Sequence, residues 1–361
     1  MKNVNYTLLG LRGLLAFSVV IFHIYGSAVI EGYIGGFSQE QLLYMINYAG
    51  PISVDLFFVI SGYLITQSLS NKRSLGEFVI NRMIRIYPVF IVIHLFIFAV
   101  GPFIEYKWMA GIGVREYVTH FVSNALLLPG IFELPIAQIV AWSLSYELFF
   151  YIIAGLTWFI YCGTKLHKLG KYTFYLLIIT LCAILVYYRK DMLFFAVGAA
   201  LYFSQDWIKR GWKPNKYFYF NGVITLAAIY CSFQLLKAPI IAALVLSFLF
   251  FITIITEHGL LSSLLRTKLM RYLGKISFSL YMWHTMVMFP LKIFVPKISG
   301  LLGSSSLAFT IYASLSLVLS IVISHLSYQY LEVRFAGYLK TRWKRNRAVN
   351  RSESERVINQ N

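Results

Sequence analysis

Four ionisable residues within long apolar stretches of this sequence have side chains suited to acid–base chemistry. They are Arg12 and His23 in the first stretch, Asp55 in the second and Glu147 in the fourth. A charge in hydrocarbon is costly, so such groups usually face an internal cavity and mark function. Arg12 and His23 are eleven residues apart, which is about three helical turns and about 16 Å, so they share one helix face.

The depth of these groups follows from the side on which the chain starts. With the N-terminus in the cytoplasm, Arg12 lies near the inner edge and His23 in the outer half. We expect Asp55 and Glu147 to match the depth of His23, because their helices enter from the outer side. Two carboxylates and an imidazole at one level can form a base with an orienting partner. Alternatively, Asp55 and Glu147 have a structural role and pair with Arg, Trp or Tyr donors on other helices. The spacing of these residues by itself indicates an internal cavity and does not specify a reaction.

The composition identifies an integral membrane protein. Of 361 residues, 59% are hydrophobic and 13% charged, whereas a soluble domain has about 45 to 50% apolar and about 25% charged residues. A disordered chain, a disulfide scaffold and a nucleic-acid-binding module are thereby excluded, and the net charge of +18 indicates basic cytoplasmic loops. Cys162, Cys182 and Cys231 form no CxxC pair and have no histidine at ligand spacing, so we expect no metal.

Long apolar runs predict an all-α fold, a polytopic membrane helix bundle of about ten transmembrane helices. Lys and Arg collect in alternate loops, which predicts that both termini are cytoplasmic and that the protein is a multi-pass protein of the cytoplasmic (inner) membrane. The ten predicted spans cover residues 8–30, 49–68, 86–104, 139–161, 172–188, 193–203, 218–236, 240–256, 276–295 and 307–330.

The chain is predicted to hold one folded domain. Residues 1–335 form the transmembrane domain, and residues 336–361 form a basic cytoplasmic tail that we expect to be disordered and to contact anionic membrane lipids. The outer segment 105–138 carries an apolar patch and is expected to lie over the outer mouth of the bundle. The sequence has no nucleophile elbow, Walker loop or metal cluster, which disfavours covalent serine, nucleotide-hydrolysing and metal catalysis.

Five motifs follow one another along the chain. They are LRGLLAFSVVIFH at 11–23, SVDLFFVISGYLI at 53–65, NRMIRIYP at 81–88, AWSLSYELFFY at 141–151 and LGKISFSLYMWHTMV at 273–287. The first contains an Arg-x10-His pattern, and each motif alone would be a weak signal. Together and in this order they resemble the membrane acyltransferase type 3 family, whose members modify cell-surface glycans and some small molecules.

The resemblance implies an O-acetyltransferase that moves an acyl group, most often acetyl, from cytoplasmic acetyl-CoA or another acyl-CoA. The acceptor would be a hydroxyl of an envelope glycan at the outer face, such as the O-antigen of lipopolysaccharide or another lipid-linked or surface polysaccharide. On that pattern His23 is the general base, with Glu147 and Asp55 as further catalytic residues. The chemistry agrees, because a sugar hydroxyl is a poor nucleophile and histidine takes a proton near neutral pH.

The resemblance also implies a donor site and an acceptor site. Coenzyme A carries several phosphates, which suit the permanently charged arginine fork, so Arg12, Arg82 and Arg85 are expected to bind the phosphates or guide the pantetheine arm. Further residues expected at the donor site are Ser61, Tyr281 and His284. Ser143 and Ser277 are additional candidates for lining it. The aromatic residues expected at the acceptor site are Trp108, Trp142 and Tyr146.

Two alternatives stay open at this stage. Many relatives carry an extra extracytoplasmic domain that finishes the transfer, and we expect this chain either to act alone or to pass the acyl group to a separate extracytoplasmic partner protein. The other possibility is a proton-coupled transporter or exporter that uses His23, Asp55 and Glu147 as a proton relay. Transporters often show two similar halves or broken helices, and this sequence shows neither.

Overall fold

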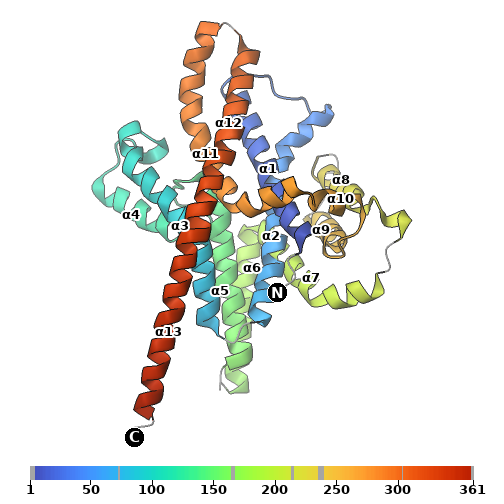
Figure 1. The fold of residues 1–361 in the computed structure, drawn as a ribbon, viewed down its shortest axis with the longest axis vertical. Coiled ribbons are helices and arrows are strands. Elements are labelled where there is room, and N and C mark those ends of the chain that lie inside the picture. The colour runs from blue at the N-terminus through green and yellow to red at the C-terminus, as the bar shows by residue number, and fades with distance from the viewer. Residues whose placement is uncertain are drawn as a thin grey trace.

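The computed structural model describes residues 5–71, 74–163, 167–212, 215–234, 240–302 and 304–358, which are all-helical (Figure 1). Short 3-10 turns join the helices, and one π-helical segment, η7, lies between α12 and α13. The elements are α1 Tyr6–Ile30, α2 Ile46–Ser70, α3 Leu75–Val100, α4 Val114–Ala125, α5 Trp142–Gly163, α6 Lys168–Tyr188, α7 Leu193–Gly211, α8 Asn221–Gln234, α9 Ile240–Ile255, α10 Gly259–Leu265, α11 Lys268–Leu302, α12 Ser305–Ser327, η7 Tyr328–Phe335 and α13 Ala336–Ile358.

Seven helices or helix runs in the described residues are long and apolar enough to cross a membrane, and the bent pair α9 and α10 would make eight. The multi-pass helical fold agrees with the sequence, but the predicted count of ten is not confirmed. The two predicted spans outside this set fall on α7 and α8. The last turns of α7 carry Lys209 and Arg210, and α8 has only 14 residues, too few to cross about 30 Å of hydrocarbon.

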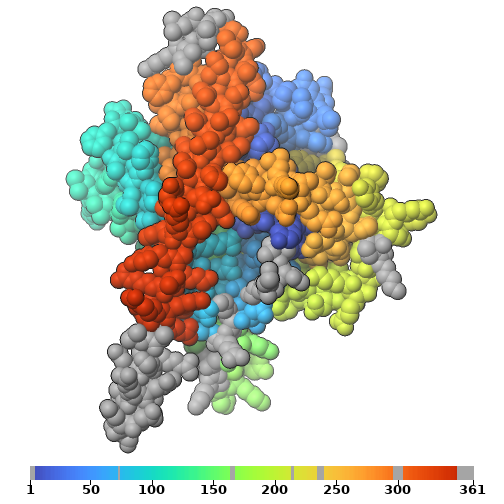
Figure 2. All heavy atoms as spheres, in the orientation of Figure 1, coloured from blue at the N-terminus to red at the C-terminus, as the bar shows by residue number. Residues whose placement is uncertain are grey.

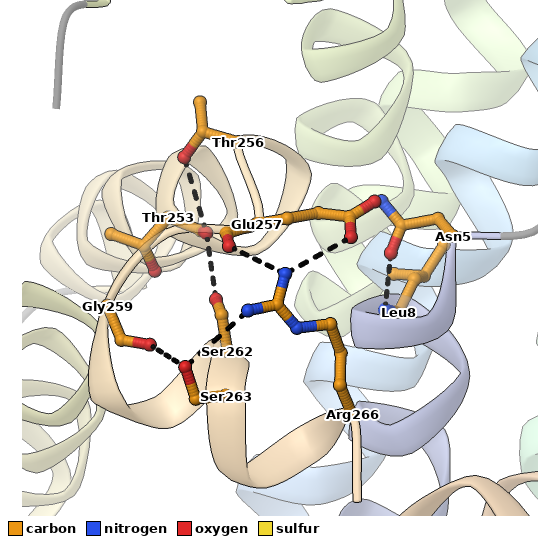
Figure 3. Close-up of polar contacts among 9 residues, drawn as sticks. All are labelled: Asn5, Leu8, Thr253, Thr256, Glu257, Gly259, Ser262, Ser263 and Arg266. Atoms are coloured by element: carbon orange, nitrogen blue, oxygen red, sulfur yellow. Dashed lines mark hydrogen bonds and ion pairs between the residues drawn. The ribbon is translucent and has the colours of Figure 1, made fainter.

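The bend of 66° between α9 and α10 is held by polar contacts at its corner (Figure 3). Arg266 donates to the carbonyl oxygen of Glu257 at 3.2 Å and lies 3.7 Å from its carboxylate. Gly259 has φ of 92°, a conformation that a side chain would strain. The start of α1 lies next to this corner, where Asn5 caps the helix by accepting from the Leu8 amide at 2.7 Å. The N-terminus of α1 thus packs beside the α9–α10 corner.

Helices α1 and α11 pack backbone against backbone. A Cβ atom added to Gly13 would lie 2.6 Å from the amide nitrogen of Gly274, and one added to Gly274 would lie 2.0 Å from the carbonyl oxygen of Leu9. Small residues permit such an approach and are a common means of helix association in membranes. The two helices run parallel in constant register, because ten residues after this contact His23 meets His284.

The basic tail differs from its prediction. Residues predicted to be disordered form α13, which continues from α12 through η7 and lies along the long axis as one ridge (Figures 1 and 2). Extending an existing helix avoids the cost of a new helix nucleus, and Lys and Arg are good helix formers. Arg347 also lies 3.9 Å from the carboxylate of Glu77 on α3. The structure therefore corrects the prediction of disorder for residues 336–358.

Replacing Gly274 with alanine is expected to destabilise the bundle, because the new methyl group would overlap the backbone of α1. Overpacking of this kind costs about 1 to 3 kcal/mol. The thermal unfolding midpoint of the purified protein in detergent should fall by several degrees. Gly26→Ala is the matched control, since a Cβ at Gly26 of α1 meets nothing within 4 Å. Equal midpoints for the two variants would contradict the close packing.

Candidate active site

A narrow cavity of about 70 Å³ lies where α1, α2, α3, α5 and α11 meet. These are the five helices that carry the five sequence motifs, so motifs far apart in the chain converge on one site. Aromatic rings of α2 and α11 form much of its apolar wall. The polar residues that line it are Arg12, Ser61, Arg85, Ser143, Glu147, Ser277 and Tyr281.

Two guanidinium groups and one carboxylate face this cavity. Arg12 comes from α1 and Arg85 from α3. Glu147 of α5 accepts a hydrogen bond from Ser61 at 2.9 Å and a second one from the hydroxyl of Tyr151. Fixed positive groups in a small, largely apolar space stabilise developing negative charge far better than they would in water. The cavity therefore suits a reacting group that gains negative charge.

A second carboxylate, that of Glu332, compensates the charge of the same arginines, and the sequence patterns did not reveal it. It accepts a hydrogen bond from Ser279 of α11 at 2.6 Å and interacts electrostatically with Arg12 and Arg85. The tenth predicted span ended at residue 330, two residues before Glu332, so Glu332 was not counted among the ionisable groups within the spans. The π-helical segment that places Glu332 here has no sequence signature, although such segments are frequent at functional sites.

His23 and His284 form a pair close to the cavity. Nε2 of His284 lies 3.2 Å from Nδ1 of His23. Nδ1 of His284 lies 3.1 Å from the carbonyl oxygen of Leu280, which can only accept, so this nitrogen carries the proton and Nε2 accepts. Nδ1 of His23 likewise lies 3.0 Å from the carbonyl oxygen of Val19 and is protonated. The hydrogen bonds thus leave Nε2 of His23 with the free lone pair of a base.

Tyr281 connects the histidine pair to the cavity. Its ring centroid lies 6.2 Å from that of His284, and its hydroxyl, which faces the cavity, lies 2.8 Å from the hydroxyl of Ser143. His284 is fully buried and His23 partly so. The predicted donor residues Arg12, Arg85, Ser61 and Tyr281 therefore lie in one cavity, while His284 lies beside His23.

The expected depth of Glu147 is wrong. Glu147 shares a cavity with Arg12 and so lies toward the level of Arg12 and not at the level of His23. The reason is the start of α5: Gln138, before the helix, already donates to the carbonyl oxygen of Met282, next to the histidine pair. The helix runs from that level toward the level of Arg12, so its first turns carry Glu147 past the histidines.

Asp55 is separated from the other predicted catalytic residues. Its neighbour Val54 lines the arginine cavity, whereas Asp55 lines a second cavity of about 310 Å³ together with Asp191 and Ser232. Successive residues on a helix point about 100° apart, so the side chains of Val54 and Asp55 project from different faces of α2. The geometry does not bring Asp55 to the arginines or the histidine pair.

Arg82 also lies outside the cavity lining. Its guanidinium is buried over the rings of Phe78 and Tyr151, at 5.4 and 5.5 Å from their centroids. Tyr151 donates a hydrogen bond to Glu147, so Arg82 supports the Glu147 carboxylate indirectly, through Tyr151. Of the two arginines in the Arg-x-x-Arg pair, only Arg85 faces the cavity in the described structure.

The three aromatic residues predicted for the acceptor lie in two places. Trp142 and Tyr146 pack on the ring of Phe58, a cavity-lining residue, with centroids 6.2 and 5.7 Å away. Trp108 instead packs on His120 at 4.7 Å within the outer segment, which contacts α3. The structure thus places Trp142 and Tyr146 beside the cavity and Trp108 apart from it.

This fold and site define a multi-pass helical membrane protein with a buried centre of arginine, carboxylate and histidine. The profile of a family described as "Acyltransferase domain" matches residues 5–325, and the chain belongs to that family, the membrane acyltransferases of type 3. It is therefore a membrane acyltransferase. No curated protein and no solved structure matches the chain. Within the described ranges, no group of three or more His, Cys, Asp or Glu side chains is arranged to hold a metal.

Glu332→Gln is expected to destabilise the protein, because the two arginines would lose one of their compensating carboxylates. The loss should exceed the about 1 kcal/mol that an exposed ion pair contributes at most. Glu31→Gln is the matched control, since Glu31 lies 3.6 Å from Lys292 in a partly exposed pair. Thermal unfolding in detergent compares the two. A Glu332 variant as stable as the Glu31 variant would show that the arginines do not depend on Glu332.

Proposed function

We propose that the protein transfers an acetyl group from cytoplasmic acetyl-CoA to a hydroxyl of an envelope glycan sugar on the outer side of the cytoplasmic membrane. Family membership supports the acyl transfer itself. The observation that carries the rest is the pairing of His23 with His284, which leaves one basic nitrogen free close to a cavity with two arginines. The resemblance to glycan-modifying enzymes supports the acceptor class.

The proposed reaction assigns His23 the role of general base. Its Nε2 takes the proton of the acceptor hydroxyl as that oxygen attacks the thioester carbonyl carbon. The tetrahedral adduct then expels the coenzyme A thiolate, which takes the proton back from His23. Arg12 and Arg85 line the neighbouring cavity, nearer the start of α1, and bind the donor arm that leads to the reacting carbonyl. His284 holds the productive tautomer of His23 throughout.

The size of the arginine cavity favours a short acyl group. Its volume of about 70 Å³ is small beside the about 300 to 1,000 Å³ of cavities that take drug-sized ligands. An acetyl thioester end fits such a space, whereas a long acyl chain would need the surrounding rings to move. This supports acetyl as the group transferred.

Family membership and geometry both favour transfer over a proton relay. The relay considered from the sequence needs His23, Asp55 and Glu147 in contact with one another. Asp55 faces a separate cavity, and Glu147 lies with the arginines. No feature of the described residues favours transport specifically.

His23→Ala is expected to abolish acetyl transfer while leaving a folded protein, because it removes the base and not the packing of α1. The measurement is thiol release by purified protein given acetyl-CoA and an extract of surface glycans. His258→Ala, at a partly exposed histidine whose ring contacts the carbonyl oxygen of Asn215, is the control and should keep wild-type release. Glycan-dependent release that survives in the His23 variant would disprove the assignment.

Arg85→Gln is expected to weaken acetyl-CoA binding at least tenfold, because a charge-assisted contact to the donor would be lost. Arg82→Gln should change the affinity much less and mainly lower the unfolding temperature, since Arg82 packs on aromatic rings outside the cavity. Titration calorimetry and thermal unfolding on both variants separate the two effects. Equal losses of affinity would contradict the different placement of the two arginines.

A further inference from the structure

A third cavity, larger than the arginine cavity and the Asp55 cavity, opens at the start of α1 and α11. We call it the basic cavity. Its volume is about 490 Å³, and Tyr6, Leu9, Lys268, Arg271, Tyr272 and Lys275 line it. Cavities that bind ligands the size of a nucleotide usually measure about 300 to 1,000 Å³. The arginine cavity, at about 70 Å³, is far too small for one. A donor with a bulky nucleotide therefore needs a second site, and this cavity has the size for it.

The charge of this basic cavity is uncompensated. Among the described residues, its lining holds no carboxylate, and Lys268, Arg271 and Lys275 form no ion pair. The Nε atom of Arg271 is buried and has no hydrogen-bond partner in the described structure. Arg266, in the same basic stretch, is by contrast paired with Glu257. Three clustered cations with an unsatisfied donor suit a ligand that carries several phosphates.

The cavity also offers an aromatic surface. The guanidinium of Arg271 lies over the ring of Tyr6, 5.0 Å from its centroid. The hydroxyl of Tyr272 is held 3.1 Å from Nδ1 of His325, which fixes that ring from α12. Aromatic and guanidinium planes stack on nucleobases, and stacking contributes about 1 to 3 kcal/mol per base. The lining thus combines phosphate recognition with a surface for a base.

The basic cavity and the active site lie along the same two helices. On α1, Tyr6 and Leu9 precede Arg12, and His23 follows about 16 Å beyond Arg12. On α11, Lys275 of the basic cavity lies two residues before Ser277 of the arginine cavity. The order along the helices is therefore basic cavity, arginine cavity and histidine pair.

We propose that the basic cavity binds the phosphate-bearing adenine nucleotide of coenzyme A. The proposal rests on the proposed function for its ligand, and it places the nucleotide against Arg271, Lys275 and Tyr6. The pantetheine arm then extends through the arginine cavity toward the histidine pair, where the thioester reacts. An anionic lipid headgroup carries the same phosphate chemistry, so the experiment separates the two sources.

The test uses adenosine 3′,5′-bisphosphate, the nucleotide end of coenzyme A without its arm, titrated into the full-length protein in zwitterionic nanodiscs. The double variant Arg271→Gln/Lys275→Gln is expected to bind it at least tenfold more weakly than wild type. Arg266→Gln should stay within twofold, because that side chain is paired with Glu257. Equal unfolding temperatures confirm that the variants are folded. Should the double variant unfold, the single Lys275→Gln variant, at an exposed position, should weaken binding about threefold.

A second arm tests the lipid source and the link to catalysis. Unchanged bisphosphate affinity in the double variant, with loss of bound phosphatidylglycerol from mixed nanodiscs, would overturn the proposal in favour of a headgroup site. S-acetylpantetheine, which lacks the nucleotide, should be turned over equally by wild type and double variant. If wild type releases no thiol from either donor while nucleotide binding still depends on Arg271, the proposed function fails and the nucleotide site stands.

Discussion

The close contact between α1 and α11 sets the geometry of the whole site. Gly13 and Gly274 bring the two backbones together, so neither helix can slide along the other without a clash. The same number of residues, ten, separates Gly13 from His23 and Gly274 from His284. Because the helices are parallel and the glycines are in contact, the two histidines meet, with Nε2 of His284 3.2 Å from Nδ1 of His23. Arg12, adjacent to Gly13, is fixed by the same contact.

Charge compensation is the second requirement, because two arginines inside a membrane bundle are costly without partners. Two carboxylates that are far apart in the chain meet this need, Glu147 from α5 and Glu332 from η7. Hydroxyl groups of Ser61 and Ser279 in turn donate to these carboxylates. The arginines are therefore held by an arranged network, yet Arg12 and Arg85 keep a face toward the cavity. This is the arrangement expected of groups that must receive charge from a ligand.

The sequence predicted which motifs lie together better than it predicted how their residues are arranged. All five motifs converge on one cavity, and Arg12 and Glu147 both line it. Their relative depth was wrong, because a residue count from the loop cannot reveal that α5 starts inside the bundle. Asp55 was misplaced for a related reason: in a helix that is apolar all round, periodicity does not indicate which face meets which cavity. Glu332 was missed because a π-helical segment depends on packing and has no composition of its own.

The histidine pair shows how a base can be oriented in an apolar bundle. A carboxylate partner, as in a serine protease, would add a buried anion that costs several kcal/mol unless it is itself compensated. His284 is a neutral partner, held in one tautomer by the carbonyl oxygen of Leu280, so it orients His23 at no such cost. In the proposed reaction His23 accepts a proton, its Nδ1–H faces the lone pair of His284 Nε2, and the bond becomes charge-assisted. The hydrogen bond between the histidines is thus strongest when positive charge develops on His23. An interaction that strengthens in the transition state lowers the barrier, whereas one equally strong in the ground state does not.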